Sequence, residues 1–187
     1  DELDSRIKEK VIEPTVRGLS KDGIAFRGFL YAGLMIDSNL NPKVLEYNCR
    51  FGDPETQPIM MRLKTDLAAL CLKACKKELS NEELDWDTRK SLGVVMASGG
   101  YPYNYEKGDI IQGIMEESED LKVFHAGTIF EEGSIKSNGG RVLCVTTLGE
   151  SVLLAQKKAY DAISKIKWKD CFYRNDIGYR AIEREKS

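Results

Sequence analysis

Residues 42–57 read Pro-Lys-Val-Leu-Glu-Tyr-Asn-Cys-Arg-Phe-Gly-Asp-Pro-Glu-Thr-Gln, and this stretch passes from an alternating run into a charged turn. The alternation over residues 43–48 predicts a β-strand. Because side chains alternate between the two faces of a strand, Glu46 and Asn48 are expected on one face and Leu45 on the other. A carboxylate and an amide oxygen on one face can share a Mg²⁺ ion, although a solvent-facing strand edge can carry the same residue types.

The turn that follows this strand concentrates charged side chains. Arg50 offers forked donors that suit a phosphate or a carboxylate, and Asp53 and Glu55 add two carboxylates on either side of a proline. Loops at strand ends often carry binding residues, which favours a substrate-facing role. A structural interpretation also fits, with Asp53 capping the next helix and Pro54 at its first position. The two interpretations are compatible, because a capping residue can also face a substrate.

The patterns on both sides of this stretch predict an α+β fold. Before it, a helix is expected over 4–21 and a strand over 26–37, which would pair with 43–48 as a hairpin. After it, an amphipathic helix is expected over 55–79 and a polar linker over 80–90. The later elements are four short strands, a helix, and a C-terminal strand or loop, expected at 92–97, 109–114, 122–129, 141–147, 151–166 and 170–183.

The change of pattern after the linker predicts two domains, residues 1–88 and residues 89–187. The second domain carries two glycine pairs, at 99–100 and 139–140, which suit either tight hairpin turns or contact with a substrate. His125, the only histidine, lies between Phe and Ala and is interpreted as a packing residue rather than as a general base.

The composition argues against several classes of protein. The chain has 28 basic and 30 acidic residues and a formal net charge of −2, which disfavours a nucleic acid or an anionic membrane as partner. No apolar run approaches the ~20 residues of a membrane span, and the first residues do not resemble a signal peptide. Five cysteines without a CxxC pair, together with one histidine, argue against a zinc site and favour a reducing, cytoplasmic protein.

The motif around Glu46 resembles a known family. Glu46-x-Asn48 after an apolar strand resembles the metal-binding strand of the ATP-grasp superfamily. The run Arg-Phe-Gly-Asp-Pro-Glu-Thr-Gln at 50–57 resembles the signature of the glycinamide ribonucleotide synthetase (phosphoribosylamine–glycine ligase) family. Further similar motifs lie at 28–34, 95–102, 123–128, 138–143 and 173–181. The resemblance implies the C-terminal portion of an ATP-grasp domain, followed by a small β-rich domain with one helix.

This resemblance implies an ATP-dependent carbon–nitrogen ligase of purine biosynthesis. Glycine and 5-phosphoribosylamine would give glycinamide ribonucleotide, ADP and phosphate through an acyl phosphate. Glu46 and Asn48 would hold Mg²⁺ or Mn²⁺, and Leu45 would pack near the ATP nucleotide. Two anions must approach each other in such a reaction, so divalent metal and arginine are needed to neutralise charge.

The resemblance also implies substrate contacts on the far side of the motif. Arg50 would face the transferring phosphoryl group or a substrate anion, and Asp53 would orient the amine of glycine or of phosphoribosylamine. Glu55 is a further candidate in the same turn. Arg141, which directly follows the second glycine pair, could reach the phosphoribosyl phosphate.

The chain departs from the family pattern in two ways. Leu34 falls where many ATP-grasp enzymes have a further acidic metal ligand, and Asp37 is the nearest acid. The family is also more than twice as long, so the chain is expected to be its C-terminal part and inactive without the missing N-terminal portion. The alternatives are a non-catalytic fragment that binds a partner carrying that portion, or another ATP-grasp carboxylate–amine ligase.

Overall fold

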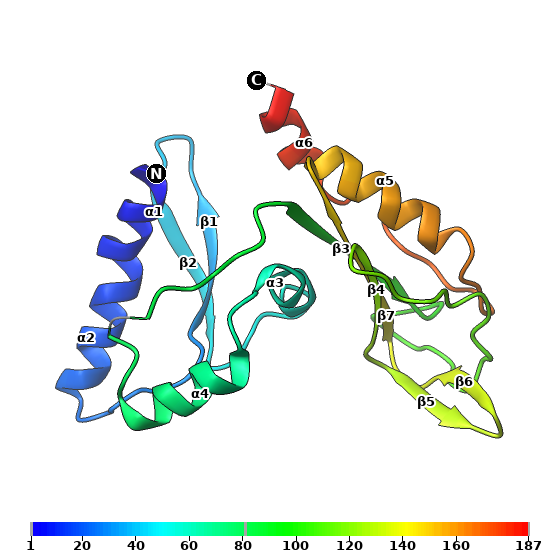
Figure 1. Cartoon of the computed structure of the whole chain (residues 1–187), viewed down its shortest axis with the longest axis horizontal. Coiled ribbons are helices and arrows are strands. Elements are labelled where there is room, and N and C mark those ends of the chain that lie inside the picture. Colours follow the sequence, from blue (N-terminus) through cyan, green and yellow to red (C-terminus); the bar gives the residue numbers. More distant parts are fainter. Residues whose placement is uncertain (1, 81, 187) are drawn as a thin grey trace. The chain divides into compact units, whose positions relative to one another are not determined.

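Two compact units make up the structure, a computed structural model that describes residues 2–80 and 82–186 (Figure 1). The first unit comprises Asp1–Asp53 and Asp66–Glu83, and the second comprises Pro54–Thr65 and Leu84–Ser187. Helices and antiparallel sheets occur in both, which confirms the predicted α+β class. The prediction of two domains, residues 1–88 and residues 89–187, stays a prediction.

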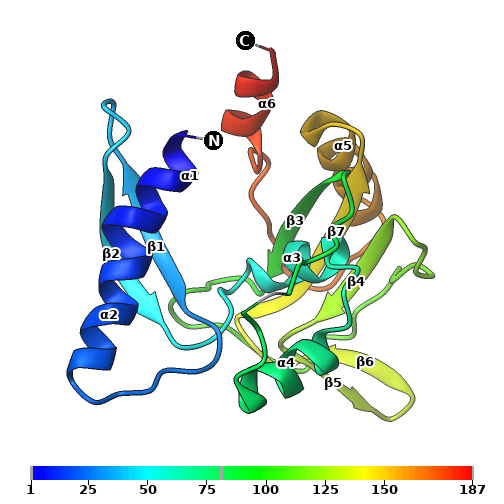
Figure 2. The same ribbon diagram turned by 60° about the vertical axis from the view of Figure 1, so that its left-hand side comes forward.

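A continuous helical run begins the first unit and lies along one face of a hairpin (Figures 1 and 2). It consists of α1 (Glu2–Ile7), the π-helical turn η1 (Lys8–Ile12) and α2 (Glu13–Lys21). The backbone N–H of Glu13 bonds to the carbonyl of Lys8, five residues back, just before Pro14 in the first turn of α2. Because proline has no N–H to donate, a widened turn ahead of it allows the helix to continue without a break.

The hairpin pairs β1 (Tyr31–Ile36) with β2 (Pro42–Asn48) in antiparallel register. Both predicted strands are found, although the first begins at Tyr31 rather than at residue 26. Asp37 stabilises the connecting turn, because its Oδ1 accepts hydrogen bonds from the backbone N–H groups of Asn39 and Asn41, both at 2.9 Å. These bonds, that of Asn41 foremost, hold the pKa of the Asp37 carboxyl below its usual value.

The helix predicted over 55–79 is wrong as a single element, because the chain breaks it in two. Helix α3 (Thr56–Arg62) ends where Leu63 turns extended and bridges to Trp86. Helix α4 (Leu67–Lys76) then begins at Asp66, whose carboxylate accepts the backbone N–H of Ala69 at 2.9 Å. The apolar period runs through both helices, so periodicity concealed a break that the Asp66 cap marks.

A three-stranded antiparallel sheet forms the centre of the second unit, in the order β3-β7-β4. Its strands are β3 (Lys90–Ala97), β4 (Leu121–His125) and β7 (Arg141–Gly149). Helix α5 (Val152–Ile163) packs on the face that carries Val94 and Val145. Helix α3 packs on the other face, where a Cβ on Gly93 would lie 3.2 Å from Pro58. The sheet therefore lies between two helices.

The remaining elements of the second unit differ from the sequence expectation in three places. A hairpin of β5 (Thr128–Glu131) and β6 (Ser134–Ser137) replaces the single strand expected to run on to residue 129. The strand expected over 109–114 contains only isolated bridges. The C-terminal segment forms helix α6 (Tyr179–Lys186), which corrects both the expected strand or loop and the expectation of one helix in this domain.

Burial differs sharply between the two units. Among the described residues, Val11 is the only buried apolar side chain of the first unit, whereas the second unit holds a continuous core around Met96, Leu143 and Ile163. A two-stranded sheet encloses little volume, so the first unit has almost no interior of its own. The helices in the described part of the chain all lack the length and apolar character needed to cross a membrane.

The cysteines differ in environment but share one chemical state. All five are free thiols. Cys144 is buried in the second unit, Cys71 is half-buried, and Cys75 is exposed. Helix α4 presents that side chain to solvent because the first unit offers no core to cover it.

An ion-pair network fastens the chain just before β3 to the rest of the second unit. Arg89 Nη2 lies 2.6 Å from Asp87 Oδ2 and 2.9 Å from Glu119 Oε1, and its Nη1 lies 2.5 Å from Asp120 Oδ1. Lys158 on α5 contacts the other oxygen of Asp120 at 2.7 Å. Asp87 is only 7% exposed. The end of the predicted polar linker is therefore an anchored part of this unit.

We expect this network to make the second unit sensitive to acid. The hydrogen bonds from Arg89 hold the pKa of Asp87 well below its usual value, and the hydrogen bond from Lys158 lowers that of Asp120. A carboxyl with a depressed native pKa stabilises the fold above its unfolded pKa of about 3.9 and loses that contribution as the pH falls further. Replacing Asp87 with asparagine should lower the melting temperature at pH 7 by about 5 °C.

Melting curves recorded from pH 7 down to pH 3 check this expectation. The difference in melting temperature between the wild type and the Asp87→Asn variant should narrow below about pH 4, where Asp87 begins to protonate in the unfolded chain while the native carboxyl stays charged. Asp161→Asn is the matched control, because Asp161 is exposed and its carboxylate makes no ion pair among the residues described. A gap that stays constant with pH would show that the Asp87 charge does not stabilise the fold.

Candidate functional site

Glu46 and Asn48 lie side by side on one face of β2. The amide Nδ2 of Asn48 donates to Glu46 Oε1 at 3.2 Å, so the two side chains converge rather than diverge. On the opposite face, the hydroxyl of Tyr47 lies 2.7 Å from Thr15 Oγ1 on α2. The helical run therefore covers the Tyr47 face, and the carboxylate and the amide lie on the other.

A β-bulge shapes the strand just before Glu46. Gly33 pairs with Glu46 and Leu34 pairs with Val44, which leaves Leu45 as the extra residue between them. Leu45 is 66% exposed. A bulge bends its strand and redirects side chains, so it affects the direction of both Leu45 and Glu46. Alternation alone could not predict this irregularity.

Among the described residues of the first unit, no third acidic residue joins the pair. Leu34 pairs with Val44 and supplies no oxygen ligand, and the carboxylate of Asp37 is occupied by the turn that it stabilises. Across residues 2–80 and 82–186, no group of three or more His, Cys, Asp or Glu side chains is arranged to hold a metal ion.

The charged turn after β2 keeps Arg50 beside an aromatic pair. Arg50 Nη1 donates to the carbonyl of Phe51 at 2.7 Å, and the Phe51 ring stacks on Phe29 with centroids 3.9 Å apart. Asp53 lies exposed in the turn. Helix α3 begins with Glu55 as its N-cap residue, so the prediction that Asp53 caps this helix is wrong. The turn continues for two residues beyond Asp53 before helical geometry begins.

The predicted site residues divide between the two units. Leu45, Glu46, Asn48, Arg50 and Asp53 belong to the first unit, whereas Glu55 and Arg141 belong to the second. Glu55 and Arg141 are both exposed, at the start of α3 and at the start of β7.

The loops that carry the two glycine pairs of the second unit pack against each other, which the sequence could not reveal. Ser98 Oγ donates to the carbonyl of Gly139 at 3.0 Å, and its backbone N–H donates to the carbonyl of Gly140 at 2.9 Å. A Cβ on Gly140 would lie 2.2 Å from the Tyr101 ring. The close packing of these two loops explains why position 140 is a glycine. Arg141 is the next residue along the chain.

His125 is exposed at the end of β4 rather than packed. Its Nδ1 lies 3.1 Å from the Thr128 hydroxyl, across the tight connection to β5. The prediction that His125 is a packing residue is therefore wrong. No acidic side chain pairs with this imidazole in the described part of the chain.

Two models of one protein family match most of the chain. Residues 1–56 match the model described as the ATP-grasp (A) domain of phosphoribosylglycinamide synthetase. Residues 91–180 match the model described as the C domain of the same enzyme. The strand with Glu46 and Asn48 lies in the first match, and the sheet with Arg141 in the second. The first match assigns residues 1–56 to the ATP-grasp class of domain.

Individual relatives agree with the family models. The chain is 57% identical to a phosphoribosylamine–glycine ligase of Escherichia coli O157:H7 over its whole length, which is 44% of that protein. It is 58% identical to the ligase of Vibrio vulnificus strain CMCP6 over 99% of its length and 43% of the relative. The crystal structure of phosphoribosylamine–glycine ligase from Thermotoga maritima superposes with a TM-score of 0.77 at 35% identity, covering 92% of this chain and 42% of that one.

The chain belongs to the phosphoribosylglycinamide synthetase family and corresponds to its C-terminal part. It spans less than half the length of the curated relatives that it matches.

Proposed function

We propose that this chain forms the C-terminal part of a ligase that joins glycine to 5-phosphoribosylamine at the expense of ATP. The products are glycinamide ribonucleotide, ADP and phosphate, and the glycine carboxylate is activated as an acyl phosphate. The observation that carries this proposal is the pair of Glu46 and Asn48 on a bulged strand that leads into the run at 50–57. This combination lies within a chain of the family.

The residues present fit a divalent cation shared with the substrate. Glu46 offers a carboxylate and Asn48 an amide oxygen, and their side chains already lie within hydrogen-bond distance of each other. Mg²⁺ and Mn²⁺ accept such hard oxygen ligands and take further ligands from phosphate and water. A bound cation would neutralise the phosphate charge that otherwise repels the glycine carboxylate. Leu45, exposed at the bulge, would pack against the nucleotide.

Four further residues would contact the substrates. Arg50 has forked donors suited to a phosphoryl group or a carboxylate, and Asp53 is exposed where it could accept from an amine. Glu55, the N-cap residue of α3, would contact a substrate amine. Arg141 would bind the phosphate of the ribosyl substrate, because it directly follows the glycine pair at 139–140, which Ser98 holds by two hydrogen bonds.

Substrate dependence in the complete enzyme tests the proposed reaction. ADP release should require glycine and phosphoribosylamine together, and omission of either should reduce it to background. Replacing phosphoribosylamine with other amines should not restore turnover. Turnover with an unrelated amine would instead favour another ATP-grasp carboxylate–amine ligase. If the 187-residue chain copurified with a separate polypeptide and the pair remained inactive, the alternative of a non-catalytic fragment would hold.

Gly33 provides a more selective test of the cation site. It faces Glu46 across the hairpin, and a Cβ there would lie 3.0 Å from Glu46 Cγ, so Gly33→Ala must displace the Glu46 side chain by a few tenths of an ångström. We expect the complete ligase to need about three- to tenfold more Mg²⁺ for half-maximal activity, since ligand orientation tunes metal affinity. Titration of Mg²⁺ at saturating ATP measures this.

Gly18→Ala is the matched control for that variant. A Cβ on Gly18, in helix α2, would have no atom within 4 Å, so its Mg²⁺ requirement should equal that of the wild type. An unchanged Mg²⁺ requirement in Gly33→Ala would argue against Glu46 as a ligand.

A further inference from the structure

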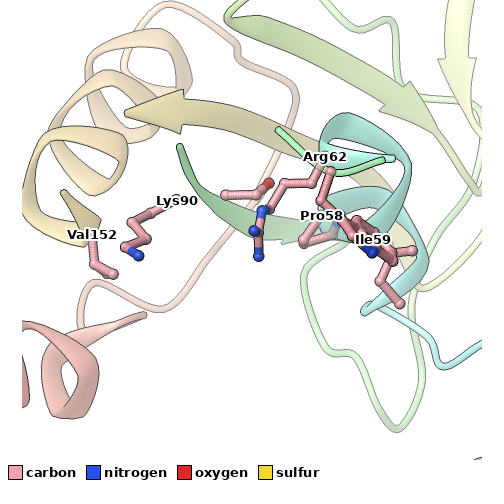
Figure 3. A pocket seen from close by; sticks show the side chains of 7 residues that line it. Pro58, Ile59, Arg62, Lys90 and Val152 are labelled. Atoms are coloured by element: carbon pink, nitrogen blue, oxygen red, sulfur yellow. The ribbon is translucent and has the colours of Figure 1, made fainter. Parts of the chain in front are cut away.

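The second unit contains a groove whose lining residues have no proposed role in the ligase reaction. It is lined by Pro58, Ile59, Arg62, Trp86, Lys90, Ser91 and Val152 and has a volume of about 450 Å³. All of these residues belong to the second unit, so the groove is complete within it. Figure 3 shows the Arg62 side chain extending from α3 and the Lys90 side chain from the start of β3.

Two cations at this groove have no carboxylate partner in the described part of the chain. Arg62 uses its Nε to donate to the carbonyl of Asp87 at 3.0 Å, which leaves its terminal nitrogens available. Lys90 forms no ion pair among the residues described. The carboxylate of Asp87 is turned to Arg89, and that of Glu185 accepts the backbone N–H of Val152 at the start of α5. Arg62 and Lys90 thus bring two positive charges to the groove, and the Glu185 carboxylate lies at its Val152 end.

A buried hydroxyl gives the groove a further polar group. The Oγ of Ser91 is inaccessible to solvent and has no hydrogen-bond partner within the protein. Buried polar atoms are normally satisfied, so an unpaired one in the wall of a groove indicates a missing partner. Ser91 follows Lys90 directly on β3, which places this hydroxyl next to the lysine in sequence.

An aromatic and apolar surface lies beside these polar groups. Trp86 is 37% exposed, and the Arg62 guanidinium lies 6.0 Å from the centre of its ring system. Pro58 and Ile59 extend the apolar wall from helix α3. An anion with a planar ring matches this arrangement, because the ring can pack on the indole while its charge meets Arg62 and Lys90.

We propose that this groove binds a nucleoside monophosphate at a site separate from the ATP-grasp strand. The phosphate is held by Arg62, Lys90 and the hydroxyl of Ser91, and the base packs on Trp86 and the adjoining apolar wall. The volume of about 450 Å³ is of the size that small-molecule sites have. The site contains no group that would transform the ligand, so its role is binding.

Fluorescence provides a direct test, because the chain has two tryptophans in contrasting environments. Trp86 lines the groove, whereas Trp168 is 7% exposed in the core. Titrating adenosine 5′-monophosphate into the 187-residue chain should give a saturable change in emission. Trp86→Phe should abolish that change. Adenosine and inorganic phosphate, each lacking half of the ligand, should both bind at least about tenfold more weakly.

Charge reversal at Lys90 tests the phosphate end of the site. Lys90→Glu should weaken binding of the monophosphate by about tenfold or more in calorimetric titration, and Lys90→Arg should retain it. Lys165→Glu is the matched control, since it changes net charge equally just beyond the far end of α5. Glu46→Gln should bind normally, so the result does not depend on the proposed ligase site.

Several results would overturn the proposal. Equal binding of inorganic phosphate and the nucleotide would show a simple anion site without base recognition. Equal losses of nucleotide affinity in the Lys90→Glu and Lys165→Glu variants would show a non-specific charge effect. Loss of binding in Glu46→Gln, with Lys90→Glu unaffected, would place the nucleotide on the ATP-grasp strand instead.

Discussion

Replacing Glu46 with alanine should reduce the turnover of the complete ligase at least about a hundredfold, while leaving the fold intact. Glu46 is exposed and its carboxylate is bonded only to Asn48 in the described structure, so its loss disturbs no packing. The proposed role is to hold the divalent cation that neutralises phosphate charge, and alanine offers no oxygen ligand. Initial rates of ADP formation at saturating glycine and phosphoribosylamine measure the effect.

The control for this variant is Glu83→Ala, which removes an exposed carboxylate from the same unit. Glu83 makes no hydrogen bond or ion pair among the described residues. Its turnover should match the wild type. Asn48→Asp offers a second comparison, because it preserves an oxygen ligand and should retain far more activity than Glu46→Ala. Full turnover in Glu46→Ala would refute the metal assignment.

Replacing Leu143 with alanine should destabilise the second unit by about 3 kcal/mol. Leu143 has no exposed surface and lies on the central strand β7, between Met96 of β3 and His125 of β4. Its truncation would leave a cavity that the neighbouring strands cannot fill without losing their hydrogen bonds. Urea unfolding followed by the fluorescence of buried Trp168 measures the free energy of unfolding.

Leu153→Ala is the matched control for the core variant. Leu153 is 49% exposed on α5, so its truncation removes little buried surface and should cost less than about 1 kcal/mol. If the Leu143→Ala and Leu153→Ala variants lost equal free energy of unfolding, the β3-β7-β4 sheet would not form the stabilising core of this unit.

Much of the local structure follows from the sequence, and the exceptions have physical causes. The helix before β1, the hairpin β1–β2 and the sheet strands β3 and β7 lie where periodicity predicts them. The break between α3 and α4 was concealed by a continuous apolar pattern, although Asp66 before an apolar run is a recognisable cap signal. The turn at 132–133, where both residues have positive φ, separates β5 from β6 within a short span.

Helix α6 shows the limit of reasoning from local pattern. Its sequence is rich in charged residues, and only Ile182 is buried among its side chains. The helix follows Gly178, where φ is +86° and a Cβ would lie 2.6 Å from Leu92. Contact with the sheet across more than 80 residues of sequence thus determines where this helix begins, and no local signal reports such a contact.

The sequence by itself determined the proposed cation pair. Side chains of a strand alternate with a period of two, so the sequence places Glu46 and Asn48 on one face. The run at 50–57 likewise carries its family resemblance without any help from folding. These features are local, and local geometry is a property of the chain alone.

Only the tertiary structure decided which distant residues meet. The pairing of Ser98 with Gly139 and Gly140, and the groove that brings Arg62 to Lys90, depend on strands and helices packed from separate parts of the chain. Sequence separation gives no information about such contacts, because burial of apolar surface across the whole β3-β7-β4 sheet selects them.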